Sequence, residues 1–150
     1  MRIRVTNKQK EMKIQTPMVR QIVKSTIEAA GVTCDEVSVY FIDTKTMCRL
    51  HADFFDDPSP TDCISFPLDD DDTPFYRVLG EIFVCPATAI EYSTLHCCDP
   101  YEELTLYLIH GLLHLFGYDD IEEHERRKMR KAEKTYMTQL RNQGLILRIT

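Results

Sequence analysis

The spacing of apolar and polar residues changes several times along the chain. Residues 2–6 alternate polar and apolar side chains, as a half-buried strand does. Short apolar runs, bounded by turn-forming residues, predict three further strands at residues 37–42, 63–66 and 78–85. Five helices are predicted at residues 17–30, 44–54, 86–97, 100–116 and 121–142. This order predicts one α+β domain over residues 1–150, with a four-stranded mixed sheet packed against five helices.

Proline, glycine and aspartate mark the expected ends of these helices. Thr16 is expected to cap the first helix, because Pro17 after it is well tolerated at the first helical position. Asp43 is the expected N-cap of the second helix. Gly31 and Gly117 are placed to end the first and fourth helices.

Two acidic segments interrupt the pattern on either side of the third predicted strand. The stretch 56–62 holds two prolines and three aspartates, and we expect a loop there. Asp69–Asp72 are four consecutive aspartates that repel one another, which predicts a solvated, mobile tip. The sequence leaves open whether this run contacts a protein partner or only solubilises the loop.

Net charge alone argues weakly against a nucleic-acid partner. The 150 residues contain 18 Lys and Arg against 24 Asp and Glu, a formal charge of −6. The distribution is uneven, since residues 1–50 carry +4, residues 51–120 carry −14 and residues 121–150 carry +4. This layout is compatible with a polyanion-binding face beside an acidic patch.

The sequence has none of the features that we would expect of a secreted or membrane-bound protein. Residues 1–8 contain no apolar signal region, and no run reaches the ~18 apolar residues of a membrane span. The six cysteines form no CxxC pair, and most lie in apolar segments, as free thiols in a reducing compartment do. We therefore expect a cytoplasmic protein with neither a membrane partner nor a dinucleotide cofactor.

The segment around the fourth predicted helix carries the most specific chemistry. His110 and His114 are four residues apart, so a helix places them on one face about one turn apart. Two imidazoles at that separation can hold one cation. Gly117 then ends the helix, and Asp120 in the following turn could return over the same cation. The spacing predicts a three-ligand metal site with open positions for water.

Other interpretations of this segment stay open. The two histidines could be hydrogen-bonded core residues, although burying two imidazoles among leucines without a shared partner is costly. Asp120 could form a capping box with Glu123 at the start of the last helix. A zinc peptidase is disfavoured, because Gly111 stands where an HExxH motif has its catalytic glutamate. That glycine instead leaves room beside the metal for close backbone approach.

Three segments carry a resemblance to a known family. Residues 110–119 read HGLLHLFGYD, residues 60–67 read PTDCISFP and residues 79–85 read LGEIFVC. Together they resemble, in order, the signature stretches of the YbeY family of bacterial rRNA maturation factors. The resemblance implies a metal-dependent, single-strand-specific endoribonuclease that uses zinc. It also implies action on rRNA of the small ribosomal subunit, in 16S 3′-end maturation and ribosome quality control.

Two positions depart from the family pattern. The third metal-binding histidine of the family falls on Asp120, which is a competent zinc ligand but would admit other divalent cations. His124 is the alternative third ligand. Phe55 stands where the family has an arginine, and a phenyl ring cannot neutralise a phosphate. The alternative function is therefore a non-catalytic ribosome-assembly or RNA-binding factor with weak or no nuclease activity.

Further candidates surround the predicted metal ligands. Ser65, Asp62 and Glu81 are candidate catalytic residues that could orient a water molecule, although Ser65 and Asp62 could instead satisfy backbone groups and Glu81 could face solvent. The candidate RNA-binding residues are the cations of the last helix and first strand: Arg126, Arg127, Lys128, Arg130, Lys131, Arg2 and Arg4. A plain solvated helix face is the alternative for them. An RNA enzyme requires these basic segments to share one face near the two histidines.

Overall fold

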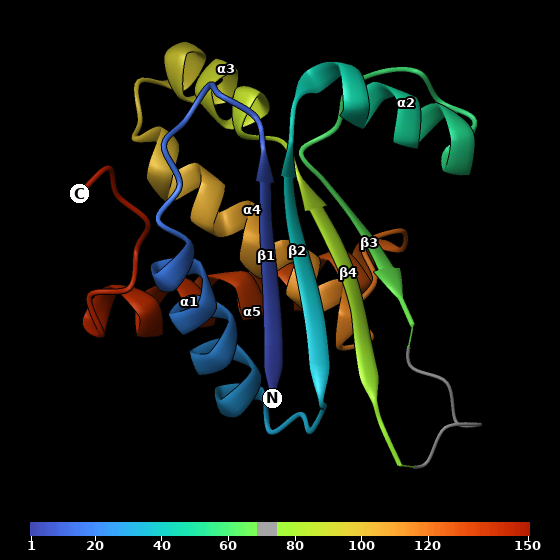
Figure 1. Ribbon diagram of the computed structural model, residues 1–150, viewed down its shortest axis with the longest axis vertical. Coiled ribbons are helices and arrows are strands. Elements are labelled where there is room, and N and C mark those ends of the chain that lie inside the picture. The colour runs from blue at the N-terminus through green and yellow to red at the C-terminus, as the bar shows by residue number, and fades with distance from the viewer. Residues whose placement is uncertain (69–74) are drawn as a thin grey trace.

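Four strands and five helices make up the part of the chain that the computed structural model describes, residues 1–68 and 75–150 (Figure 1). The predicted acidic tip at Asp69–Asp72 lies outside these described residues. The elements confirm the predicted α+β class with a mixed sheet. They are β1 (Arg2–Lys8), α1 (Thr16–Ala30), β2 (Glu36–Ile42), α2 (Thr44–Phe55), β3 (Cys63–Pro67), β4 (Val78–Val84), α3 (Pro86–His96), α4 (Pro100–Leu115) and α5 (Glu123–Asn142).

The sheet has the strand order β1-β2-β4-β3, with only β3 antiparallel to its neighbour. Its two faces are covered differently. Val39 and Ile82 are partners in the β2–β4 register and belong to the main core, together with side chains of α1, α4 and α5. Tyr40 and Phe83 pair one position further on and belong to a second cluster with α2 on the opposite face. Figure 1 shows α4 and α5 crossing behind the strands.

Helix α4 lies at the centre of the core, between the sheet and the other helices. Leu108, Ile109, Leu112 and Leu113 are completely buried, so the helix is apolar around most of its circumference. A helix of this kind is stable only when it is covered on several sides. The position of α4 against β3 and β4 therefore fixes where its two histidines emerge.

Gly111 allows α4 to approach the sheet closely. A Cβ atom at this position would lie 2.6 Å from Ile82 Cγ2 and 2.8 Å from Cys63 Sγ. The Oγ of Ser65 on β3 also donates a hydrogen bond of 2.8 Å to the Gly111 carbonyl. The predicted close approach at the glycine is confirmed, but its partners are side chains of β3 and β4.

We expect the Gly111→Ala substitution to lower the free energy of unfolding by about 1–2 kcal/mol. Overpacking costs about 1–3 kcal/mol, and the two contacts below 3.0 Å place this substitution in the upper part of that range, at about 2–3 kcal/mol. The better helix propensity of alanine returns about 1 kcal/mol of it. Urea denaturation measures the difference. A Gly111→Ala protein that is as stable as the unchanged chain would contradict the close packing.

The helix ends follow the predictions in part. Asp43 caps α2 by accepting a hydrogen bond from the Thr46 backbone N–H, as predicted. Thr16 was wrongly predicted as a cap, since it is the first residue of α1 and Gln15 precedes it as the N-cap. The alternative of a capping box at Asp120 does not apply, because α5 begins at Glu123 and its N-cap is Glu122.

The described residues provide two observations on compartment. None of the helices in residues 1–68 and 75–150 combines the length and apolar character that a membrane crossing requires. None of the six cysteines, all of them among the described residues, forms a disulfide bond, and Cys97 and Cys98 are exposed, contrary to the expectation of buried thiols.

Candidate metal centre

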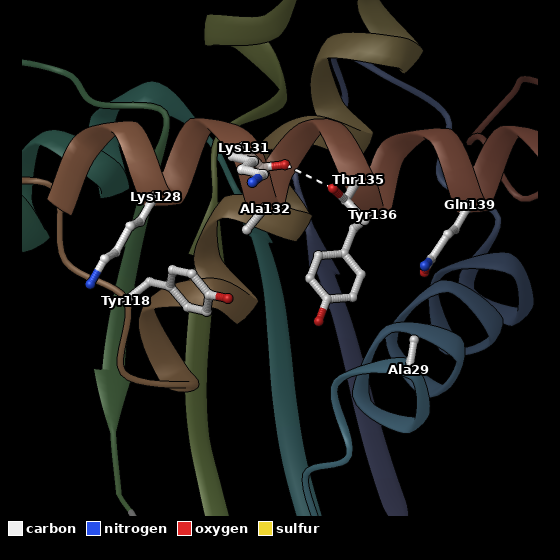
Figure 2. Close-up of a pocket in the computed structure, with 8 residues that line it drawn as sticks. All are labelled: Ala29, Tyr118, Lys128, Lys131, Ala132, Thr135, Tyr136 and Gln139. Atoms are coloured by element: carbon white, nitrogen blue, oxygen red, sulfur yellow. Dashed lines mark hydrogen bonds between the residues drawn. The ribbon is translucent and has the colours of Figure 1, made fainter. Parts of the chain in front are cut away.

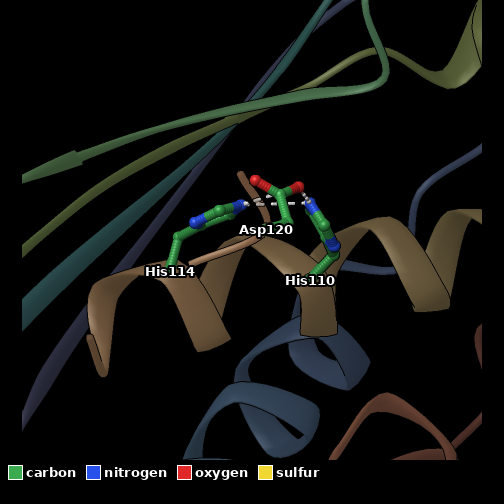
Figure 3. Close-up of side chains that lie close together, drawn as sticks. All are labelled: His110, His114 and Asp120. Carbon is green, nitrogen blue, oxygen red and sulfur yellow. Dashed lines mark hydrogen bonds and ion pairs between the residues drawn. The ribbon is translucent and has the colours of Figure 1, made fainter. Parts of the chain in front are cut away.

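His110 and His114 direct their Nε2 atoms to one point beside α4 (Figure 3). The two Nε2 atoms are 3.2 Å apart, and the side chains are 16% and 29% exposed. Ligand atoms around a tetrahedral zinc ion are about 3.3 Å apart, since zinc–nitrogen bonds are about 2.0 Å long. The two imidazoles are therefore spaced as ligands of a single cation.

Asp120 completes a group of three ligand atoms. Its Oδ2 lies 3.6 Å from Nε2 of His110 and 3.7 Å from Nε2 of His114. Gly117, with a φ of 101°, lets the chain reverse after α4. Asp119 holds the turn, because its Oδ1 accepts the backbone N–H of Asp120 at 2.7 Å. Within residues 1–68 and 75–150, these are the only three His, Cys, Asp or Glu side chains grouped closely enough to hold a metal ion.

The second ring nitrogen of each histidine already has an acceptor. His114 Nδ1 is 3.1 Å from the Tyr118 carbonyl oxygen, and His110 Nδ1 is 2.8 Å from Oε2 of Glu133. Both Nδ1 atoms must carry a proton to donate these bonds, so when both rings are neutral each Nε2 keeps a lone pair. Two lone pairs 3.2 Å apart repel each other, and a shared cation removes that repulsion. The residues therefore fit a divalent metal ion.

Glu133 is the site residue that sequence reasoning missed. Its side chain is only 6% exposed, and Arg130 Nη1 donates to both carboxylate oxygens at 2.7 and 3.0 Å. Burial raises the pKa of Glu133, but the hydrogen bonds from His110 and Arg130 outweigh it and hold the pKa below its ordinary value. The sequence did offer one signal for a buried Glu133. It lies four residues from both Met129 and Met137, so a helix places it on the same buried side of α5.

The contact between Glu133 and His110 also changes the pKa of His110. Burial tends to lower the pKa of this imidazole, because it disfavours the charged form. The hydrogen bond and charge of Glu133 act in the opposite direction and raise the pKa above its ordinary value. An anionic partner also makes the imidazole a more basic metal ligand.

Two clefts meet at Asp120. The first, with a volume of about 460 Å³, is lined by His114, Asp120, Ser65 and Phe55 among others. Phe55 is exposed and packs beside Phe66, with ring centroids 6.4 Å apart. Ser65 lines this cleft, but its hydroxyl is bonded to the α4 backbone and so ties β3 to the helix.

The second cleft, of about 390 Å³, opens on the other side of Asp120. It is lined by His110, Asp62 and Glu133, and Arg130 is the one Lys or Arg side chain among its lining residues. The structure thus brings Asp62 and Arg130 to the metal group. The side chain of Arg130 is 66% exposed and its guanidinium is paired with Glu133, while Glu103 and Asp120 also line the cleft.

Glu81 is not brought to this site. In register it pairs with Ser38 and Phe66, on the sheet face opposite α4. There it acts on Tyr40, whose pKa is raised first by burial and then by the hydrogen bond and charge of Glu81. The apolar run that contains Glu81 did not reveal which face the side chain takes.

The remaining predicted site residues, the alternative ligand and the arginines of the first strand, lie apart from the three ligand atoms. His124 is exposed in the first turn of α5 and lies outside the group of three ligand atoms. Arg4 pairs with Glu36 at 3.3 Å, and by the strand alternation it and Arg2 lie on the sheet face opposite α4. The condition that both basic segments share one face near the two histidines is therefore not met for the first strand. This dispersal counts towards the non-catalytic alternative.

Comparison with known proteins agrees with the motifs. A family model described as endoribonuclease YbeY matches residues 4–141. A protein of Protochlamydia amoebophila named endoribonuclease YbeY is 53% identical over 146 residues, covering 97% of each chain. One of the same name from Chlamydia pneumoniae is 37% identical over 150 residues, covering 97% of this chain and 95% of the relative.

A solved structure shares the fold. The solution structure of TM1509 from Thermotoga maritima is similar with a TM-score of 0.68 and 25% identity, covering 95% of this chain and 91% of that one. The resemblance seen in the three sequence segments is thereby confirmed over nearly the whole length. The chain belongs to the endoribonuclease YbeY family.

Proposed function

We propose that this protein is a metal-dependent endoribonuclease that cuts single-stranded RNA, with His110, His114 and Asp120 as ligands of one divalent cation. The observation that carries the proposal is the convergence of two histidine lone pairs and a carboxylate oxygen on one point. Two nitrogens and one oxygen form a ligand set that suits zinc and leaves a coordination position open. The carboxylate also makes manganese or another divalent cation acceptable.

In the proposed mechanism the side chains of this chain hold and orient the reacting groups. A divalent cation at the site supplies Lewis-acid polarisation of a phosphate oxygen and makes hydroxide available near neutral pH. Glu133 fixes the ring of His110, and Arg130 places positive charge where the scissile phosphate would lie. Asp62, in the same cleft, is the candidate for orienting the attacking water.

The proposed substrate is 16S rRNA, cut near its 3′ end on the small ribosomal subunit in the cytoplasm, including in ribosome quality control. Family membership supports this substrate class. Arg130, Lys128 and Lys131 on α5 also support it, since a polyanion held near the metal site needs neighbouring positive charge.

RNA cleavage by the purified protein loaded with zinc tests the function. We expect internal cuts in a single-stranded rRNA fragment, none in a duplex of the same sequence, and loss of cutting when a chelator removes the metal. The competing function is a non-catalytic RNA-binding factor, favoured by Phe55 in the first cleft. RNA binding without any cut in the presence of zinc, manganese or magnesium would establish that alternative.

The third ligand can be assigned separately. We expect Asp120→Ala to weaken zinc binding by at least about tenfold, because one of three ligand atoms is lost. His124→Ala is the matched control and should retain the affinity, since this side chain is exposed on α5. Competition with a chromogenic chelator measures both constants. Full affinity in Asp120→Ala with loss in His124→Ala would assign His124 instead.

A further inference from the structure

A separate cleft lies between α5, the end of α1 and the turn that follows α4. Its volume is about 470 Å³, which is in the range of small-ligand sites. Two tyrosines and two lysines line it with Thr135 and Gln139, and Ala29 closes it from α1. Figure 2 shows the rings of Tyr118 and Tyr136 projecting into the same space below α5.

The lining combines aromatic rings with positive charge. Lys128 and Lys131 are exposed, whereas Tyr118 and Tyr136 are half-buried, and no carboxylate among residues 1–68 and 75–150 lines the cleft. Burial and the neighbouring Tyr118 raise the pKa of Tyr136, so its ring stays neutral. Stacking surfaces beside lysines are the features by which proteins hold single-stranded nucleic acid. Gln139 adds an amide that can hydrogen-bond to base edges, and Thr135 adds an acceptor, since its hydroxyl donates to the Lys131 carbonyl at 3.0 Å.

The cleft is connected to the metal centre through one residue. The Tyr118 carbonyl accepts the hydrogen bond of His114 Nδ1 at 3.1 Å, while its ring lines the cleft. The turn that begins at Gly117 therefore forms a wall of the cleft and orients a metal-ligand candidate. An RNA strand with a base in the cleft would continue past this turn towards His114.

We infer that this cleft binds one nucleotide of the single-stranded RNA substrate beside the cleavage site. The base lies against the rings of Tyr118 and Tyr136, and its flanking phosphates lie at Lys128 and Lys131. This inference rests on the proposed function for the identity of the ligand. The cleft contributes binding rather than chemistry, because none of these side chains is among the metal-ligand candidates.

Binding of a short fluorescein-labelled single-stranded RNA by the metal-loaded protein tests the inference. We expect Tyr136→Leu to raise Kd and KM by about tenfold, in line with the loss of one stacked base. Tyr136→Phe keeps the ring and should retain most of the affinity. Lys131→Gln should weaken binding and lower the slope of log Kd against log salt by about 0.7, the value for one phosphate contact on a single strand.

Lys134→Gln is the matched control, since this lysine lies on the same helix but lines a different cleft with Glu102 and Arg141. It should bind RNA as the unchanged protein does. Unchanged affinity in Tyr136→Leu and Lys131→Gln, in a protein that cuts RNA, would overturn this inference alone. An equal loss in Lys134→Gln would also overturn it, because the charge would then act diffusely. Weaker RNA binding in both variants of a protein that never cuts RNA would support the cleft and refute the nuclease.

Discussion

Replacing His114 with alanine should abolish stoichiometric zinc binding and slow RNA cleavage by about 10²–10³-fold or more. One of three converging ligand atoms is lost, and with it the electrostatic stabilisation that a bound cation gives to the reacting phosphate. The fold should survive, because the side chain lies at the edge of α4 and is 29% exposed. Elemental analysis after dialysis gives the metal content, and initial rates on a single-stranded fragment give the activity.

The control for this substitution is His96→Ala. His96 is an exposed histidine at the end of α3 that stacks on Tyr92, with ring centroids 4.1 Å apart. It should keep one zinc per chain and the full rate. A His114→Ala protein that binds zinc and cuts RNA as the unchanged protein does would remove His114 from the site.

Glu133→Gln should weaken zinc binding by about 10–100-fold and lower the rate at limiting zinc. The amide has nearly the same volume and can still accept the Nδ1–H of His110, but it no longer carries the charge that makes the imidazole basic. Partners of metal-bound histidines contribute to affinity on this scale. Chelator competition at fixed pH measures the affinity, and excess zinc should restore much of the rate.

Glu123→Gln serves as the control for removing one carboxylate from α5. This residue is exposed and pairs with Arg127 at 2.7 Å, away from the histidines. Its zinc affinity should be unchanged. Equal zinc affinity in Glu133→Gln and the unchanged chain would show that the buried carboxylate has only a structural role.

The sequence predicted the ligand positions on α4 because they depend on local geometry. A helix begun at Pro100 and followed by Gly117 places His110 and His114 one turn apart, whatever surrounds it. Asp120 could be placed because the turn after the helix is short. The structure groups these three atoms, as the spacing predicts.

Glu133 and Glu81 show where the sequence was insufficient. Glu133 lies 23 residues from His110, and only the packing of α5 against α4 brings the two together. Glu81 lies in a run that is apolar at most positions, so the alternation did not reveal which face of the sheet it takes. Both cases depend on contacts between elements that are distant along the chain.

The sequence also could not show on which face of the fold each basic residue lies, because this depends on how distant elements pack together. The first strand carries its arginines on the sheet face opposite α4, where Arg4 pairs with Glu36. These two arginines therefore do not add positive charge to the site. RNA contact near the metal is expected from α5, with Arg130 on one side of the helix and Lys128 and Lys131 on the other.

A zinc-containing crystal, measured on both sides of the zinc absorption edge, would locate the metal directly. We predict one strong anomalous peak about 2.0–2.2 Å from Nε2 of His110, Nε2 of His114 and a carboxylate oxygen of Asp120. A strong peak held by other residues would contradict the proposed metal centre, as would the absence of any peak at these three side chains in a crystal that contains zinc.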